Sequence, residues 1–121
     1  MKDFAATLPG LDRIKTRFIT MLEERQGEIA HHAFGAWDGT EPNEVRDHLE
    51  AARDILHKIA GSAGSLGFGP LGQAASDCEK EINVHLESAN ENTSTFPITI
   101  MERMDTFVSM CQALLADGAQ A

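Results

Sequence analysis

The feature that most constrains the fold is an apolar repeat, in steps of four and three residues, between residues 45 and 66. Such spacing places side chains on one face of an α-helix, because the helix turns once in about 3.6 residues. The repeat lasts for about three heptads, which is long enough for a helix that faces a protein core. It predicts one long amphipathic helix. The repeat consists of Val45, Leu49, Ala52, Leu56, Ile59, Ala63 and Leu66.

Three further segments have helical spacing and predict one helix each. The first runs from about Leu11 to about Gly35, the third opens at Pro70, and the fourth begins near Pro97. The residues expected to face inward are Leu11, Ile14, Phe18, Met21, Leu22, Arg25 and Ile29 in the first; Leu71, Ala75, Cys78, Ile82 and His85 or Leu86 in the third; and Met101, Met104, Val108, Cys111 and Leu115 in the fourth, flanked by Ile100, Phe107 and Leu114.

Turn-forming residues mark the expected connections. Gly35 to Pro42 predicts a turn in which Trp37 covers one end of the core. Thr40 or Glu41 is expected to cap the second helix, with Pro42 in its first turn. The other expected non-helical segments are an arm over residues 1–9, a helix stop around residues 67–69, a loop over residues 90–95 and a fraying tail over residues 117–121.

Long helices with short connections favour an all-α fold, an antiparallel up-down-up-down four-helix bundle with a short N-terminal arm. The 121 residues are expected to form a single domain, large enough for one core. The composition, with 42% hydrophobic residues, five Met and no Tyr, is typical of such a bundle.

Charge and cysteine usage exclude several classes of function. A net charge of -9 argues against nucleic acid as a partner, since a phosphate backbone demands a basic face. No stretch approaches the roughly 20 apolar residues that cross a membrane, and the first residues lack the apolar run of a signal peptide. Cys78 and Cys111 are too few for a secreted disulfide framework and fall on apolar stripes. They predict buried thiols in a cytoplasmic protein.

His57 lies one residue, hence roughly 100°, off the apolar stripe of the second helix. The residues before it on its own row are polar, and those one and two turns after it are Gly61 and Gly64. Glycine costs about 1 kcal/mol relative to alanine inside a helix. Two glycines on one face therefore indicate space kept clear beside the imidazole, so that another macromolecule can approach it.

The segment at residues 57–67, HKIAGSAGSLG, resembles the signature of histidine-containing phosphotransfer (HPt) domains. These are the four-helix-bundle phosphocarriers of two-component phosphorelays. Many members carry a lysine three residues after the histidine, where this chain has Ala60; here a lysine, Lys58, follows the histidine directly. The residues that carry the match are His57, Gly61, Ser62, Gly64, Leu66 and Gly67.

The resemblance implies that His57 exchanges a phosphoryl group with the aspartate of a response-regulator receiver domain. The expected partners are receiver domains and a hybrid sensor histidine kinase, not nucleic acid or a membrane. The chain is also expected to be a monomeric phosphocarrier, not an enzyme with its own kinase or nucleotide site. No cofactor or metal is expected on this chain, and Mg²⁺ is expected on the receiver. Lys58 is expected to screen the phosphoryl charge. The expected partner-binding residues are Arg53, Ala60, Gly61, Ser62, Gly64 and Ser65.

Glu79 is predicted to orient the imidazole. If the second and third helices form a hairpin that turns at about Phe68, His57 and Glu79 each lie eleven residues from the turn and so at the same height. We expect the Glu79 carboxylate to accept a hydrogen bond from Nδ1–H of His57, which would hold one tautomer and raise the basicity of Nε2. In the family a Gln or Glu at this offset plays the same part.

Two other functions stay open at this point. Glu28 to His31, and Asp54 to His57, have the Glu-x-x-His type of spacing found in di-metal carboxylate bundles, although the stripe beside His57 is apolar. A scaffold that binds receivers without carrying phosphate is the other alternative.

Simpler structural interpretations also stay open for several residues. The glycines could serve close helix packing, with Gly67 as helix terminator. Ser62 and Ser65 could bond to carbonyls of the preceding turn, and Arg53 and Lys58 could be solvated surface charges. The remaining histidines are expected to be structural: His31 and His32 near the end of the first helix, where a cation suits its dipole, His48 in solvent, and His85 at the edge of the core.

Overall fold

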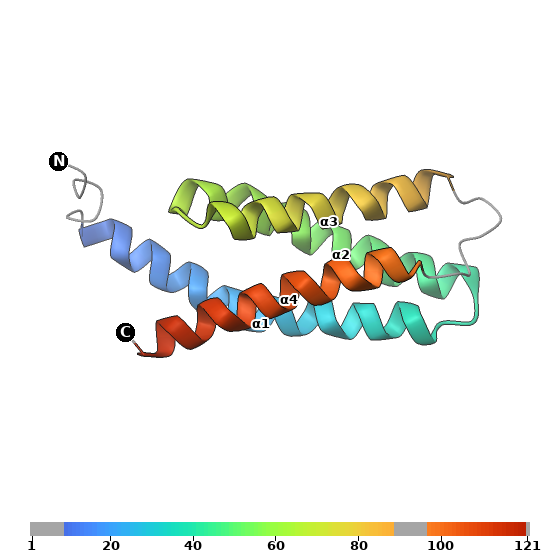
Figure 1. Cartoon of the computed structure of the whole chain (residues 1–121), viewed down its shortest axis with the longest axis horizontal. Coiled ribbons are helices and arrows are strands. Elements are labelled where there is room, and N and C mark those ends of the chain that lie inside the picture. The colour runs from blue at the N-terminus through green and yellow to red at the C-terminus, as the bar shows by residue number, and fades with distance from the viewer. Residues whose placement is uncertain (1–8, 89–96, 121) are drawn as a thin grey trace.

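The computed structural model describes residues 9–88 and 97–120, and within them the chain forms four α-helices (Figure 1). Consecutive helices run in opposite directions, so the predicted all-α, up-down-up-down bundle is confirmed (Figure 1). The helices are α1 (Pro9–Asp38), α2 (Pro42–Ala63), α3 (Gly69–Ser88) and α4 (Ile98–Gln120), and the short 3₁₀ turn η2 (Gly64–Leu66) continues α2.

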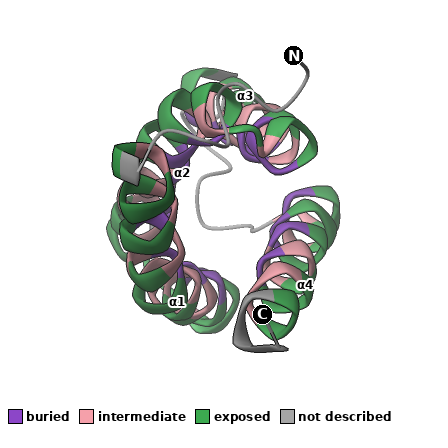
Figure 2. Cartoon of the chain, turned by 90° about the vertical axis from the view of Figure 1, so that its left-hand side faces the viewer, coloured by how far each residue is buried: buried purple, intermediate pink, exposed green. Residues whose placement is uncertain are grey.

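Each helix turns its buried residues toward the middle of the bundle (Figure 2). α1 packs against α2 and α4, and α3 packs against the same two helices. Burying one such Leu, Ile or Phe side chain contributes about 1.5–3 kcal/mol, so this core is what stabilises the fold. The stripe predicted in α2 is buried from Val45 to Ala63, and the stripe predicted in α3 is buried at Leu71, Ala75, Cys78, Ile82 and Leu86.

α4 is rotated slightly from the expected orientation. Ile100 and Phe107, expected only at the flanks of its stripe, are fully buried together with Met104. Met101 and Val108, expected inside, are only half-buried. α4 has two adjacent apolar rows, so periodicity alone does not show which of them faces the core. Packing against α1 and α3 buries the row that contains the large Phe107 side chain.

α1 and α4 are longer than predicted. α1 starts at Pro9 and continues to Asp38, which confines the turn before α2 to residues 39–41. Trp37 therefore lies on the helix with half of its surface exposed and is no lid over the core. Residues 117–120, predicted to fray, are helical and continue α4, and residue 121 lies outside the described residues. The remaining part of the predicted arm, residues 1–8, and the predicted loop at residues 90–95 lie outside the described residues.

α2 begins at Pro42, as predicted, with Glu41 at the N-cap position. The Glu41 side chain makes no capping hydrogen bond. Instead the carboxylate of Glu44 accepts a hydrogen bond from the backbone N–H of Thr40 at 3.2 Å, so the helix start is held from inside its first turn.

The turn between α2 and α3 positions the two helices that carry the site. Gly67 has a φ of +90°, a left-handed conformation that glycine adopts without strain, so its predicted role as helix terminator is confirmed. The backbone N–H of Phe68 donates to the carbonyl of Ala63 at 2.8 Å. The Phe68 ring stacks on Phe18 of α1, with ring centroids 5.3 Å apart. The turn is therefore anchored both to its own hairpin and to α1.

Candidate functional site

His57 projects from α2 beside α3, with 74% of its side chain exposed. Its Nδ1 lies 2.8 Å from Oε2 of Glu79, whose side chain is only 18% exposed. An ionised carboxylate accepts hydrogen bonds and cannot donate them, so Nδ1 carries the proton and donates. In the neutral ring the lone pair is then on Nε2, at the other edge of the imidazole. The contact expected from the hairpin spacing is present.

Glycines keep the surface beyond His57 open. A Cβ added at Gly61 or at Gly64 would meet nothing within 4 Å, so neither glycine is needed for close helix packing. The predicted bare face is therefore confirmed. It forms part of an open groove between α2 and α3, whose lining residues are His57, Ala60, Gly61, Gly64, Gly69, Gly72, Gln73, Ser76 and Glu79.

The close approach of α3 to α2 depends on Gly72, which the sequence analysis missed. A Cβ at Gly72 would lie 3.3 Å from the backbone nitrogen of Gly64 and 3.4 Å from Cβ of Ala63, both tight contacts. The available signal was the row Gly72, Ser76 and Glu79, which has helical spacing and places small residues on the face of α3 that carries Glu79.

The two cations nearest to His57 in the sequence do not line this groove. The Arg53 guanidinium is paired with the carboxylate of Asp54, which follows it, at 3.2 Å. Lys58 is exposed and lines a different hollow, together with Arg25 and Met21 of α1. Their part in charge screening stays a prediction.

The predicted partner-binding residues divide between two surfaces. Ala60, Gly61 and Gly64 line the groove beside His57, whereas Ser62 lines the hollow on the α1 side of α2. The Ser65 hydroxyl donates to the carbonyl of Ser62 at 3.0 Å, which is the backbone hydrogen bond expected from its structural interpretation. Their contacts with a partner stay predictions.

Three histidines that the sequence analysis treated separately lie together. His31 and His32 of α1 and His48 of α2 each offer a ring nitrogen within 4.8 Å of the others. The prediction that His48 is solvated is wrong, because its ring packs against α1 where Gly35 leaves room for it. The dipole explanation for His31 and His32 is also wrong, since α1 continues for more than a turn beyond them.

His85 lies at the edge of the core, as predicted. Its ring is half-buried, and Nε2 is buried without a hydrogen-bond partner among the described residues. Burial lowers the pKa of His85 below its ordinary value of 6.5, because desolvation disfavours the charged ring.

The carboxylate-lined core of a di-metal bundle is not found in the described residues. Glu28 pairs with Arg25 at 2.8 Å, and Asp54 and His57 are exposed. The buried residues of the core are apolar. Within the described part of the chain, the one group of three or more potential metal ligands is the cluster of His31, His32 and His48.

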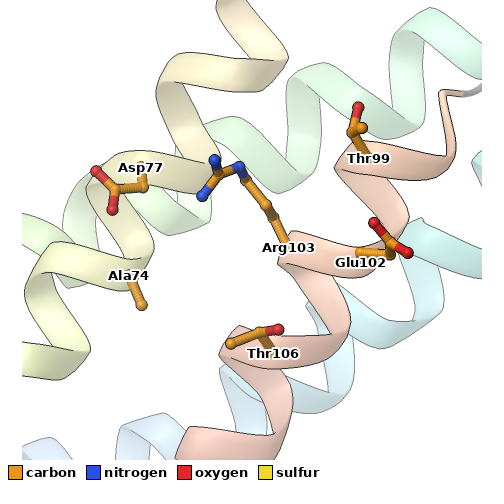
Figure 3. Close-up of a pocket in the computed structure, with 6 residues that line it drawn as sticks. All are labelled: Ala74, Asp77, Thr99, Glu102, Arg103 and Thr106. Carbon is orange, nitrogen blue, oxygen red and sulfur yellow. The ribbon is translucent and has the colours of Figure 1, made fainter.

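A separate hollow lies between α3 and α4 (Figure 3). Arg103 reaches from α4 toward α3, and its Nε lies 3.5 Å from a carboxylate oxygen of Glu81. Asp77 accepts a hydrogen bond from the Gln73 amide at 2.9 Å. The hollow offers no imidazole or thiol among its described lining residues, so the groove beside His57 remains the better candidate. Its lining consists of Ala74, Asp77, Thr99, Glu102, Arg103 and Thr106.

Comparisons with known proteins add one finding. The model of the Hpt domain family matches residues 13–117, which span nearly all of the four helices. Neither the curated proteins nor the solved structures gave a match.

In the described part of the chain, no helix has both the length and the apolar character needed to cross a membrane.

Proposed function

The chain belongs to the Hpt domain family, and on that basis we propose that His57 accepts and returns a phosphoryl group in a two-component phosphorelay. Hpt domains have a phosphotransfer role in two-component systems, where they interact with response regulators and kinases. The finer assignment, transfer between His57 and the aspartate of a receiver domain, rests on the site itself.

The single observation that carries the proposal is the exposed imidazole with Nδ1 bound to Glu79. Nε2 attacks the phosphorus of an aspartyl phosphate; the N–P bond forms, the acyl P–O bond breaks, and its electron pair leaves on the aspartate carboxylate. The ring gains positive charge in this step. Glu79 is positioned to stabilise that charge and to hold Nδ1 protonated. Return of the phosphoryl group reverses the same steps.

The groove beside His57 suits a macromolecular donor. Because Gly61 and Gly64 carry no side chains, a receiver can bring its aspartyl phosphate close to Nε2. Phosphoryl transfer is catalysed chiefly by positioning and charge neutralisation, and we assign both to the receiver and its Mg²⁺. Charge screening by Arg53 and Lys58 is part of the proposal, although Arg53 is paired with Asp54 and neither residue lines the groove. The carrier itself is proposed to act as a monomer without a cofactor.

A cytoplasmic location is part of the proposal, because the chain keeps two free cysteines. Cys78 and Cys111 are buried, and burial raises the pKa of each thiol from 9.0 to about 12. Such thiols stay protonated and unreactive at neutral pH.

The decisive experiment measures transfer of labelled phosphoryl groups from a phosphorylated receiver domain to the purified chain. The His57→Gln variant is expected to take up no label, with unchanged helical circular dichroism because His57 is exposed. His31→Gln is the matched control, since it removes another exposed histidine and should be labelled like the unmodified chain. Label on His57→Gln would refute the assignment. Binding of the receiver without any labelling of the unmodified chain would favour a scaffold instead.

A further inference from the structure

The three histidine rings of the cluster formed by α1 and α2 lie close to one another. The ring centroids of His31 and His32 are 5.2 Å apart, those of His32 and His48 are 5.2 Å apart, and those of His31 and His48 are 5.9 Å apart. Each ring offers a nitrogen within 4.8 Å of the nitrogens of the other two. The cluster thus joins two ligands from one helix to a third from its neighbour.

The shortest contact in the cluster has the length that a shared ion requires. Nδ1 of His32 and Nδ1 of His48 are 3.0 Å apart. With metal–nitrogen bonds of about 2.0–2.1 Å, two nitrogens on one ion are separated by about 2.9–3.4 Å, from octahedral to tetrahedral geometry. The ring nitrogen of His31 lies within 4.8 Å of the other two, so ion binding would require a rotation of this exposed side chain.

Helix α1 leaves space for the His48 ring beside His31 and His32. A Cβ at Gly35 would lie 2.5 Å from Nε2 of His48, so α1 has a glycine where the ring enters. The glycine costs about 1 kcal/mol within a helix, and the space beside it admits the third ligand.

We propose that His31, His32 and His48 bind one divalent transition-metal ion of the class that prefers imidazole ligands, with Zn²⁺ as the representative. Three histidines leave the fourth tetrahedral position of Zn²⁺ to water. Carboxylate-preferring ions such as Mg²⁺ and Ca²⁺ do not suit this ligand set. The ion would connect α1 to α2 and so stabilise the folded bundle by mass action.

This site is separate from the phosphotransfer groove. His48 precedes His57 by nine residues on α2, which places the two about 13–14 Å apart along the helix axis and roughly half a turn apart around it. His48 faces α1, whereas His57 faces α3. The inference therefore goes beyond the proposed function and does not rest on it.

The test titrates Zn²⁺ into the full chain, made without a histidine tag, in competition with a chromophoric chelator. We expect one Zn²⁺ per chain and a rise of the unfolding midpoint on addition of Zn²⁺. His48→Gln and His31→Gln are each expected to weaken binding by about 10-fold or more. His31 is exposed, so its variant tests the proposal even if His48→Gln fails to fold.

His57→Gln serves as the control, because it removes a histidine outside the cluster; its Zn²⁺ affinity and midpoint shift should equal those of the unmodified chain. Co²⁺ bound in place of Zn²⁺ should give visible absorption bands, which the cluster variants lose. Two results would overturn the proposal: absence of binding by the unmodified chain, or equal binding by the His31→Gln variant. Loss of binding in His57→Gln alone would place the ion beside the groove and overturn it as well.

Discussion

His57 of α2 and Glu79 of α3 are 22 residues apart in the sequence, and Nδ1 of the first lies 2.8 Å from Oε2 of the second. The contact spans two antiparallel helices, so the orientation of the imidazole depends on how the hairpin packs as well as on α2. In the proposed transfer it also separates the functions of the two ring nitrogens, because the nitrogen that donates to Glu79 cannot attack a phosphoryl group.

Replacing Glu79 should slow transfer more than it weakens docking. A hydrogen bond to a charged group contributes about 1.5–3 kcal/mol, so Glu79→Ala is expected to reduce the single-turnover transfer rate about 10-fold or more. Receiver affinity should change little, since Glu79 is mostly covered. Glu79→Gln keeps a hydrogen-bond acceptor without the charge, so its transfer rate should lie between the rates of the unmodified chain and of Glu79→Ala. Equal losses of rate and affinity would contradict the positioning role.

Gly61 offers a test of the docking surface. Gly61→Gln should stabilise the protein by up to about 1 kcal/mol, because it removes a glycine from a helix interior and its Cβ meets open space. The same variant should weaken receiver binding, which calorimetric titration would measure. Gly61→Ala is the matched control, with a similar gain in stability and a much smaller loss of affinity. Unchanged affinity in Gly61→Gln would mean that the receiver docks elsewhere.

Replacing Gly72 by alanine should destabilise the protein, whereas the same replacement at Gly61 should stabilise it. Gly72→Ala places a Cβ 3.3 Å from the backbone of Gly64, so α3 must shift away from α2 or carry strain. Overpacking of this kind costs typically about 1–3 kcal/mol, which exceeds the gain in helix propensity. Urea denaturation should therefore show Gly72→Ala to be less stable than the unmodified chain, whereas Gly61→Ala is more stable. A stabilised Gly72→Ala would show that α3 tolerates the displacement.

His85 should contribute to loss of stability in mild acid. Burial lowers its pKa in the folded state below the ordinary value of 6.5, so the unfolded chain binds a proton more readily. The stability from the neutral ring is complete above the ordinary pKa and declines as the pH falls below it toward the folded-state value. Between about pH 7.5 and about pH 5.5, the unmodified chain should lose more free energy of unfolding than His85→Gln. Identical losses would assign the pH dependence to other groups.

Much of the fold could be predicted because helical periodicity reports directly on burial. The stripe from Val45 to Ala63 is buried, and the hairpin spacing placed Glu79 beside His57. The rotation of α4 could not be predicted, since two adjacent apolar rows compete there. The end of α1 was misplaced because Gly35 was interpreted as a turn residue, whereas it makes room for the His48 ring.

The contact between His32 and His48 was a part that the sequence could not supply. His48 lies sixteen residues from His32, and polar residues carry no periodic signal of the partner that they face. Gly72 was missed although it shares a helical row with Ser76 and Glu79, because such a row does not show which helix packs against the glycine. The roles of Lys58, Arg53 and Ser62 stay predictions for transfer experiments.

The anchored turn at Gly67 and Phe68 sets the register of the whole hairpin. Each residue of α2 has its counterpart in α3 determined at that point, so an extra residue inserted in α3 between the turn and Glu79 would rotate the Glu79 side chain by about 100° around the helix axis. Glu79 would then face away from the imidazole, although every helix could still form. The proposed phosphotransfer would thus depend on the number of residues between this turn and Glu79 as well as on the residues beside Nε2 of His57.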